Sequence, residues 1–288
     1  MNNILILGAY GMLGSQIFKT LFRRDYSVFG TIRGPKKNIF TDDLENFLIE
    51  FVDVYDFNSL KKNIEIVKPK IVINCIGNIK QKNESYIENI YLNSLLTHKI
   101  NALSSNLNFK LIHISTDCVF SGDKGNYLES DFSDARDLYG KSKFLGEPVG
   151  INSLTLRTSI IGHEVNKPNF GLLEWVLSQK NQVFGFTNSF FSGVTTNELS
   201  KLIAHLVSNQ LLVNGLYHVS STRISKYDLL LKIRDIYNLN LEIIPSGKLS
   251  IDRSLNSKKL KLAIGYSPPN WDDMLSSMFL ENHSGWLK

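Results

Sequence analysis

The sequence predicts an α/β protein: a doubly wound parallel sheet joined to a smaller, discontinuous α/β domain. Three observations support this. Short β-branched runs alternate with amphipathic stretches through the first half, a glycine-rich turn follows the first apolar run, and strand-like runs recur after residue 150. Alternation at this spacing implies parallel strands joined by right-handed crossovers. Several runs are almost entirely apolar, as expected when helices cover both faces of a sheet.

The elements of the first domain are predicted from the periodicity of apolar residues. Strands are assigned where β-branched residues cluster, and helices where apolar residues recur every three or four positions. The predicted strands are Ile4–Leu7, Tyr26–Ile32, Phe51–Val54, Ile71–Cys75, Leu111–Ser115, Ser153–Arg157 and Gly215–Val219, and the predicted helices are Leu13–Phe22, Phe57–Val67, Ile87–Leu103 and Leu138–Gly146.

The remaining segments predict a small second domain that closes over the carboxyl ends of the strands. They comprise a helix at Leu172–Ser178, an aromatic run at Phe184–Phe191, a helix at Tyr227–Tyr237, a short strand at Leu241–Ile244 and a last helix after Pro268-Pro269. The expected division is residues 1–160 with about 193–222 for a cofactor-binding domain, and about 161–192 with 223–288 for a substrate-binding domain.

Composition indicates a folded globular protein. Of 288 residues, 43% are hydrophobic and 20% charged, so a large core needs no disulfide or metal to stabilise it. The two cysteines, Cys75 and Cys118, form no disulfide framework and fit a reducing, cytoplasmic setting. The net charge of +5 indicates a mildly basic surface, or alternatively attraction of anionic ligands. Lysine and arginine are dispersed along the chain, which argues against a nucleic-acid partner.

No membrane or metal partner is expected. The apolar stretch Ile4–Leu7 is too short for a signal peptide, and no run approaches the roughly 20 apolar residues that cross a bilayer. The six histidines show no metal-ligand spacing. We therefore expect a soluble protein, with a homodimer as the default among soluble oligomers.

The glycine-rich turn carries the first functional prediction. Gly8, Gly11 and Gly14 follow the first predicted strand and open the first helix. Such a turn brings backbone N–H groups, here including those of Tyr10, Met12 and Leu13, to a pyrophosphate at a helix N-terminus. A glycine triplet alone is weak support, but its place between strand and helix predicts a Rossmann-type dinucleotide site.

The end of the second predicted strand indicates which dinucleotide binds. NAD sites usually place an acid about 20 residues past the glycines, but here the strand ends in Gly-Thr-Ile-Arg. Arg33 can pair with the 2′-phosphate of NADP, which predicts NADPH; a solvated surface arginine is the alternative. Asp53, followed by Val54, is a candidate for the adenine amino group or an ordinary strand-end aspartate.

Two segments predict the catalytic residues. Tyr139 and Lys143 are four residues apart on a predicted helix, so both side chains lie on one face. A nearby ammonium is expected to lower the pKa of a phenol, which is near 10 in isolation, so that Tyr139 exchanges a proton with a carbonyl oxygen. Ser115 and Thr116 end the fifth predicted strand, where Thr116 can donate a hydrogen bond to the same oxygen. Either pattern alone occurs often by chance.

These motifs together resemble the dTDP-4-dehydrorhamnose reductase family of extended short-chain dehydrogenases. The resemblance covers nearly the whole chain. It is carried by the segments Gly8–Gly14, Ser115–Gly122, Tyr127–Glu129, Leu138–Glu147, Leu156–Ser159, Gly215–Val219 and Gly265–Trp271.

The resemblance implies residue roles beyond those argued from spacing. It implies a triad of Thr116, Tyr139 and Lys143, and a 4-keto sugar nucleotide as substrate. It also implies nicotinamide contacts from Cys75, Ile76 and Gly77, support from Asn93, and substrate contacts from Asn78, Thr116, Trp175, Phe191 and Ser192. For the aromatic residues among these, packing in the core of the small domain is the alternative.

Some positions depart from the family pattern. Cys118 stands where the family commonly has tyrosine, and Ala135-Arg136-Asp137 stands where it has Pro-x-Asn. The loop from Asn78 and the segment 175–193 also differ. These departures leave the chemistry intact but leave the identity of the sugar open.

The expected function is reduction of a nucleoside-diphosphate 4-keto-6-deoxy sugar by NADPH, for polysaccharide or glycan precursors. One alternative is an epimerase or dehydratase on the same scaffold, which would recycle its cofactor. Asp117 suits such chemistry, but the glutamate that commonly follows it in dehydratases is replaced by Cys118. The other alternative is a non-catalytic, NADP-binding regulatory subunit, which would not need the full triad.

Overall fold

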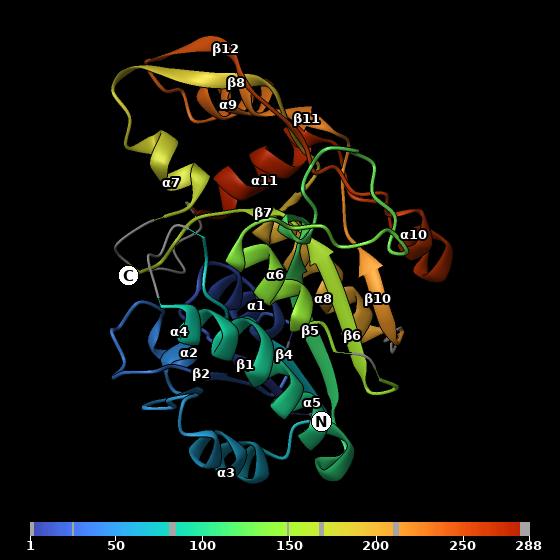
Figure 1. The fold of residues 1–288 in the computed structure, drawn as a ribbon. Coiled ribbons are helices and arrows are strands. Elements are labelled where there is room, and N and C mark those ends of the chain that lie inside the picture. The colour runs from blue at the N-terminus through green and yellow to red at the C-terminus, as the bar shows by residue number, and fades with distance from the viewer. Residues whose placement is uncertain are drawn as a thin grey trace.

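The computed structural model describes residues 3–24, 26–80, 85–148, 150–166, 170–209 and 213–282. Its lower layer in Figure 1 is a seven-stranded sheet in the order β10-β6-β5-β4-β1-β2-β3. Every neighbouring pair in this sheet is parallel. The strands are β1 (Ile4–Leu7), β2 (Val28–Thr31), β3 (Leu48–Ile49), β4 (Ile71–Asn74), β5 (Lys110–Thr116), β6 (Ser153–Thr158) and β10 (Gly215–His218).

Helices cover both faces of this sheet, so its strands alternate between two apolar clusters. Ile4 and Ile6 of β1 lie in one cluster, and Leu5 and Leu7 lie in the other. The first face is covered by α1 (Met12–Phe22) and α8 (Thr196–Ser208), and the second by α3 (Phe57–Val67), α4 (Tyr86–Ile90), the π-helical turn η1 (Tyr91–Leu95), α5 (Leu96–Leu107) and α6 (Leu138–Leu145). A short α2 (Asp42–Glu45) precedes β3.

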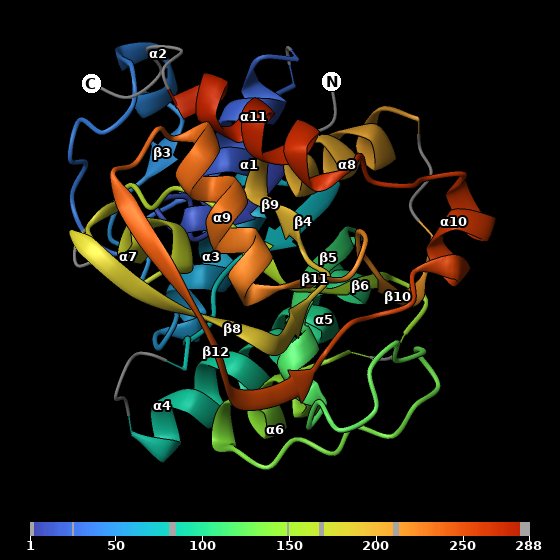
Figure 2. The same ribbon diagram turned by 90° about the horizontal axis from the view of Figure 1, so that it is seen from above.

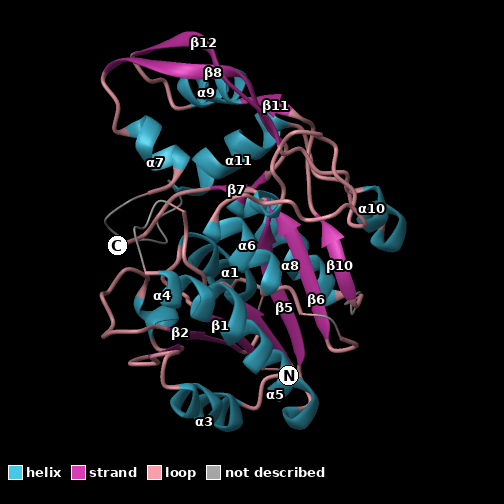
Figure 3. Ribbon diagram, in the orientation of Figure 1, coloured by secondary structure: helices cyan, strands magenta, loops and turns pink. Residues whose placement is uncertain are grey.

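A second layer lies above the carboxyl ends of the strands (Figures 1 and 3). Its three-stranded sheet has the order β11-β8-β12, and a two-stranded β7-β9 ribbon lies between the layers. Seen from above, β8 and β12 cross over the lower layer beside α9 (Figure 2). The elements are β7 (Ile160–Ile161), α7 (Leu172–Leu177), β8 (Asn181–Phe191), β9 (Val194–Thr195), β11 (Ile224–Ser225), α9 (Lys226–Ile236), β12 (Leu241–Asp252), α10 (Lys258–Ile264) and α11 (Trp271–Asn282).

The predicted fold class, a doubly wound parallel sheet with a smaller α/β part, is confirmed. The strand predicted at Phe51–Val54 is wrong, because the third strand is β3, at Leu48–Ile49. Phe51 has a φ of 58° and is 67% exposed, so the backbone leaves the extended conformation there. The predicted short strand at Leu241–Ile244 continues to Asp252, because it pairs with β8 along its length.

The helix predicted at Ile87–Leu103 is longer and is interrupted at its centre by η1. The seven-stranded sheet draws its strands from the residues assigned to the cofactor-binding domain, and the three-stranded sheet from those assigned to the substrate-binding domain. The functional division itself stays a prediction. Among the described residues, no helix combines the length and the apolar character that crossing a membrane requires.

Candidate active site

The glycine-rich turn packs against the end of β1 and leaves the start of α1 open. Gly8 has a φ of 85°, which favours glycine. A Cβ on Gly14 would overlap the carbonyl oxygen of Gly8, so α1 lies directly against the turn. Gly11 is the N-cap of α1 and provides no side-chain cap, and no acid lies in the first helical turn. The free N–H groups of this turn therefore suit a pyrophosphate.

The side chains predicted to bind the cofactor divide into two groups. Tyr10 is buried and its hydroxyl donates to the Glu45 carboxylate at 3.1 and 3.2 Å, so only its main chain can face a ligand. Leu13 and Val54 are likewise buried. Arg33 is exposed just past β2 and makes no hydrogen bond or ion pair with the residues that the structure describes.

Asp53 lies in the loop beyond β3. Its side chain is exposed, and its Oδ1 accepts a hydrogen bond from the amide of Tyr55 at 3.1 Å. Only Oδ1 is engaged in this bond, so the carboxylate retains capacity to accept a further donor.

The structure brings the three predicted triad residues to the carboxyl edge of β5. Thr116 is the last residue of β5, and Tyr139 and Lys143 lie on α6. The Lys143 ammonium donates to the carbonyl of Ile114 at 2.8 Å, which fixes α6 against the strand. The Thr116 hydroxyl donates to Asp117 Oδ1 at 3.2 Å and accepts from the Cys118 amide at 3.1 Å. It also lies close enough to the Tyr139 phenol to lower the pKa of that phenol. A carbonyl placed beside these two hydroxyls would meet two donors at once.

The protonation of Tyr139 differs from the expectation. Burial raises the pKa of its phenol, and Cys118 and Asp117 add to the increase. The Thr116 hydroxyl lowers this pKa, and Lys143 is not among its largest influences. The pKa of the Tyr139 phenol is therefore raised, opposite to the lowering expected from Lys143. Burial also lowers the pKa of Lys143 to about 8, against the opposing charge of Glu147. Tyr139 is thus a protonated phenol, the form that donates a proton.

Asn93 connects the loop that is predicted to contact nicotinamide to α6, the helix that carries two residues of the predicted triad. It lies in η1, and π-turns of this kind often occur at functional sites. Its Oδ1 accepts from the Asn78 amide at 2.8 Å, and its Nδ2 donates to the Ser142 hydroxyl on α6 at 3.1 Å. A Cβ on Gly77 would lie 3.0 Å from Asn93 Oδ1 and 3.7 Å from Lys143 Nζ, so this loop runs close past the triad.

Two further features of this loop bear on its predicted role. Ile76 Cγ1 lies against Gly8, which places the loop beside the glycine-rich turn. The Asn78 Nδ2 is buried and has no partner among the described residues, as expected of a donor that faces a ligand. Burial raises the pKa of the Cys75 thiol to about 12, so this cysteine is a packing residue and not a nucleophile.

Behind the triad lies a buried ion pair that the predicted site did not include. The Ser115 hydroxyl donates to Glu147 Oε1 at 2.5 Å. Arg157 binds the Glu147 carboxylate in a bidentate manner at 2.7 and 2.6 Å, with both side chains at least nine-tenths buried. This pair joins β5, β6 and α6 at the edge that carries Thr116. Glu147 closes the Leu138–Glu147 motif, which was the signal available in the sequence.

Two cations from the second layer also reach the site, and sequence reasoning missed both. The Arg253 Nε donates to the carbonyl of Phe120 at 2.8 Å, and its Nη1 contacts the Cys118 sulfur at 3.7 Å. The Lys226 ammonium lies 4.0 Å from the centroid of the Phe191 ring. Both cations lower the pKa of the buried Asp117, although its burial raises it more.

The predicted substrate residues of the second layer have mixed outcomes. Phe191 is buried, and its ring centroid lies 5.2 Å from that of Trp271. The Lys226 ammonium lies over the face of the same ring. Ser192 is buried, and its hydroxyl accepts from the Leu255 amide at 2.9 Å, so it holds two loops together. Trp175 is 43% exposed on α7, and its hydrogen bonds to described residues lie within that helix and the turn after it.

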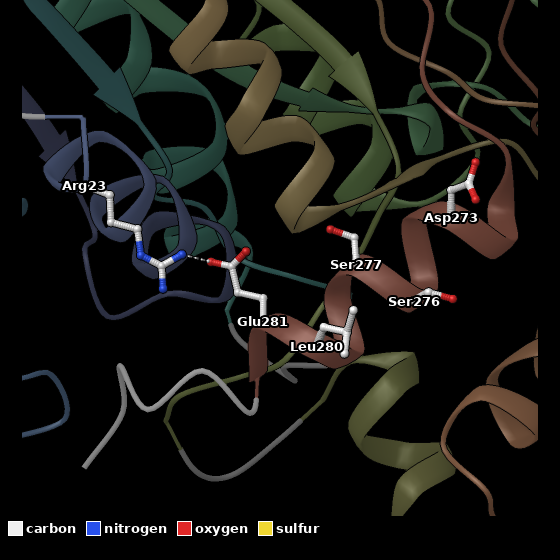
Figure 4. Close-up of a pocket in the computed structure, with 6 residues that line it drawn as sticks. All are labelled: Arg23, Asp273, Ser276, Ser277, Leu280 and Glu281. Carbon is white, nitrogen blue, oxygen red and sulfur yellow. Dashed lines mark hydrogen bonds and ion pairs between the residues drawn. The ribbon is translucent and has the colours of Figure 1, made fainter.

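A surface cavity of about 550 Å³ lies away from the triad, between α1 and α11 (Figure 4). It contains the Arg23–Glu281 ion pair at 2.8 Å and no residue of the predicted site. Its lining residues are Arg23, Asp273, Ser276, Ser277, Leu280 and Glu281.

The sequence of the chain is similar to known proteins. The spore coat polysaccharide biosynthesis protein SpsK of Bacillus subtilis is 26% identical over an alignment of 237 residues, which covers 79% of this chain and 76% of that protein. The methionine adenosyltransferase 2 subunit beta of Xenopus tropicalis is 23% identical over an alignment of 303 residues including gaps, which covers 96% of this chain and 81% of that protein.

The fold is shared with solved structures. A dTDP-4-dehydrorhamnose reductase from Bacillus anthracis, solved in complex with NADP, superposes with a TM-score of 0.80 at 22% identity, covering 98% of this chain and 99% of that one. The family described as the RmlD substrate binding domain matches residues 1–283. The chain therefore belongs to the RmlD substrate binding domain family.

Proposed function

We propose that the protein is an NADPH-dependent oxidoreductase of the extended short-chain dehydrogenase type that reduces a nucleoside-diphosphate 4-keto-6-deoxy sugar. The observation that carries the proposal is the protonated Tyr139 phenol. It lies beside the Thr116 hydroxyl at the carboxyl edge of β5. A proton donor is what reduction of a carbonyl requires, because the product oxygen gains a proton.

The cofactor assignment is supported by the phosphate turn and by the charge near Arg33. The open N–H groups at the start of α1 would hold the pyrophosphate, and Arg33 would pair with a 2′-phosphate. Lys36 and Lys37 follow Arg33, so this edge carries three cations in five residues. The structural neighbour from Bacillus anthracis was solved with NADP.

The residues of the site divide the chemistry between them. Thr116 and Tyr139 orient and polarise the substrate carbonyl with two hydrogen bonds. When bound, the reduced nicotinamide supplies a hydride to the carbonyl carbon. Tyr139 gives its phenolic proton to the carbonyl oxygen, which yields an alcohol, and then regains a proton from solvent. Lys143, held by the Ile114 carbonyl, would stabilise the resulting phenolate and bind the nicotinamide ribose.

The substrate class and the setting are the finer parts of the proposal. The second layer brings Arg253 beside the triad, where its guanidinium suits a diphosphate oxygen. The relative SpsK is named for polysaccharide biosynthesis, which supports a role in glycan precursors. Because both cysteines are free, we expect the protein to be cytoplasmic. A homodimer stays a prediction.

A non-catalytic regulatory subunit is the second candidate. It is favoured by similarity to the methionine adenosyltransferase 2 subunit beta over most of the chain. The contact of Thr116 with Tyr139 and the placement of Lys143 argue for catalysis instead, because a binding protein needs neither. An epimerase or dehydratase would also use the triad but would recycle its cofactor.

The test is NADPH oxidation with a panel of 4-keto sugar nucleotides carrying dTDP, UDP, GDP or CDP. We expect one panel member to be reduced with one NADPH consumed per product. Conversion of the sugar without net NADPH consumption would favour an epimerase or dehydratase. Tight NADPH binding without conversion of any member would favour the regulatory subunit.

A further inference from the structure

Lys226 is a cation of the site for which the proposed chemistry has no role. It is the first residue of α9, directly after the N-cap Ser225, whose side chain accepts from the Asp228 amide. Its ammonium lies over the face of Phe191, 4.0 Å from the ring centroid. The aromatic face attracts the cation but provides no hydrogen-bond acceptor of the usual kind.

The Lys226 ammonium lacks a polar partner. Within the described ranges it makes no hydrogen bond, and no carboxylate lies within ion-pair distance. Its main electrostatic partners are Asp117 and Cys118, and burial lowers the pKa of the ammonium despite them. A partly desolvated ammonium without acceptors loses hydration that nothing in the protein replaces. An oxygen from a ligand would replace it.

The position of this ammonium relates it to the reacting carbon. Asp117 and Cys118 directly follow Thr116, which contacts the Tyr139 phenol. A Cβ on Gly140 would overlap the Cys118 carbonyl oxygen, so Cys118 packs directly against the turn of α6 that carries Tyr139. Because Lys226 interacts electrostatically with Asp117 and Cys118, its ammonium lies on the side of the carboxyl edge of β5 where the keto oxygen would bind.

The charges around this place do not cancel. Arg253 directly follows β12, and its Nη1 lies 3.7 Å from the Cys118 sulfur. The amino terminus of α9 adds its positive dipole end beside Lys226. Among the described residues, three carboxylates stand against these positive charges. The pKa of Asp117 is raised by burial, Asp137 is paired with Lys80 at 2.6 Å, and Asp228 in the first turn of α9 accepts from the Ser225 hydroxyl. Because Asp137 and Asp228 already have partners, Lys226 and Arg253 are left to face Asp117, and this place suits an additional anion.

We propose that Lys226 determines specificity by binding an anionic oxygen of the substrate beside its keto group. That oxygen is either a phosphoryl oxygen of the diphosphate or a carboxylate on the ring of an acidic 4-keto sugar nucleotide, which would then replace the 6-deoxy sugar as substrate. The inference rests on the proposed function for its substrate, and it adds a residue and a charge requirement. A neutral sugar without such an oxygen close by would leave the ammonium uncompensated and would bind poorly.

The test compares Lys226→Met with Lys226→Arg, which keeps the charge, and with the control Lys232→Met. Lys232 lies on the same helix but pairs with the exposed Asp272, so its loss should change binding little. The Kd of each variant for dTDP, UDP and NADPH is measured by calorimetry. KM and kcat are measured for keto-sugar nucleotides with and without a ring carboxylate.

If the partner is phosphoryl oxygen, Lys226→Met weakens dTDP or UDP binding by about 10- to 100-fold, as for loss of a charged hydrogen bond. NADPH binding stays unchanged, and Lys226→Arg restores most of the affinity. If the partner is a carboxylate, binding of the nucleoside diphosphates is unchanged. The preference for carboxylated sugars, measured as the ratio of KM values, falls by a similar factor.

Unchanged nucleotide binding together with unchanged KM values in Lys226→Met would overturn the inference. The binding arm does not depend on turnover. A wild-type protein that binds nucleoside diphosphate through Lys226 but oxidises no NADPH would therefore contradict the proposed function and leave this inference standing. A wild-type protein that neither binds these nucleotides nor reduces the sugars would remove both.

Discussion

The side chains of the triad show what residue spacing predicts and what it does not. The four-residue spacing of Tyr139 and Lys143 placed both on one face of α6, and the strand end placed Thr116 beside them. Protonation could not be predicted in this way, because it depends on burial by segments distant in sequence. Burial raises the pKa of the Tyr139 phenol and lowers that of Lys143.

Replacing Tyr139 with phenylalanine should remove the proton donor and leave the cofactor site intact. We expect kcat for the keto sugar to fall by about 100-fold or more, the usual contribution of a general acid. The Kd for NADPH, measured by fluorescence titration, should stay within about threefold of the wild-type value. Loss of NADPH binding in the same variant would instead assign Tyr139 a structural role.

The buried histidines predict acid sensitivity. Burial and Arg157 lower the pKa of His218 from 6.5 to about 3, and burial lowers that of His113 well below 6.5. As the pH falls below 6.5, the unfolded chain gains protons that the folded protein does not. Each histidine should then reduce the free energy of unfolding by about 1.4 kcal/mol per pH unit.

Urea denaturation of the wild type and His218→Gln at several pH values between about 7 and 5 checks this. The variant should lose less stability over this range than the wild type, whatever its stability at pH 7. Equal pH slopes for the two proteins would contradict the assignment of His218 as a neutral buried group.

At the scale of elements, local patterns predicted the helices better than the strands. The helix Phe57–Val67 was predicted to the residue, because its Asp56 N-cap and apolar periodicity are local signals. The third strand was misplaced because its pairing with β2 and the positive φ of Phe51 are set by tertiary structure. The extension of β12 to Asp252 depends on pairing with β8, so Arg253 was not recognised at the site.

Because α1 packs closely on the glycine-rich turn, Gly14→Ala should reduce both stability and NADPH affinity. The added Cβ would overlap the backbone oxygen of Gly8, which cannot move aside as a flexible side chain can. We expect the free energy of unfolding to fall by about 1–3 kcal/mol and NADPH affinity to fall by about 10-fold. Calorimetry and urea denaturation measure both.

The matched control is Gly247→Ala, on the exposed part of β12. The nearest atom to a Cβ there is the flexible Asn188 Nδ2 at 3.8 Å, an ordinary contact. A Gly14→Ala variant that behaves like this control would contradict the close packing inferred for the turn.

At the scale of the whole molecule, the carboxyl edge of the lower sheet, which carries the predicted triad, is covered by a layer drawn from the carboxyl-terminal half (Figure 1). Glu281 of α11 ties this layer to the helices below. Its carboxylate accepts from Arg23 at 2.8 Å, from Gln16 at 3.0 Å and from Asn197 at 2.9 Å. The contacts join positions more than 80 residues apart, so no local pattern predicts them.

Glu281→Gln should loosen this attachment while keeping the shape of the side chain. Because three hydrogen bonds lose their charged acceptor, we expect the free energy of unfolding to fall by about 1–2 kcal/mol. The control Asp272→Asn removes an exposed ion pair on the same helix and should cost less than about 0.5 kcal/mol. Equal losses in the two variants, measured by urea denaturation, would show that Glu281 does not hold the layers together.

The central claim is that hydride passes from NADPH to the keto carbon while Tyr139 protonates the oxygen. The most direct measurement is a single turnover with NADPH deuterated on the transferred face at nicotinamide C4, using the sugar nucleotide that the panel identifies. We expect deuterium at the new carbinol carbon of the product, one per molecule, and none with Tyr139→Phe on the same timescale. Product without deuterium, or deuterium retained in the cofactor after conversion, would contradict the reductase mechanism.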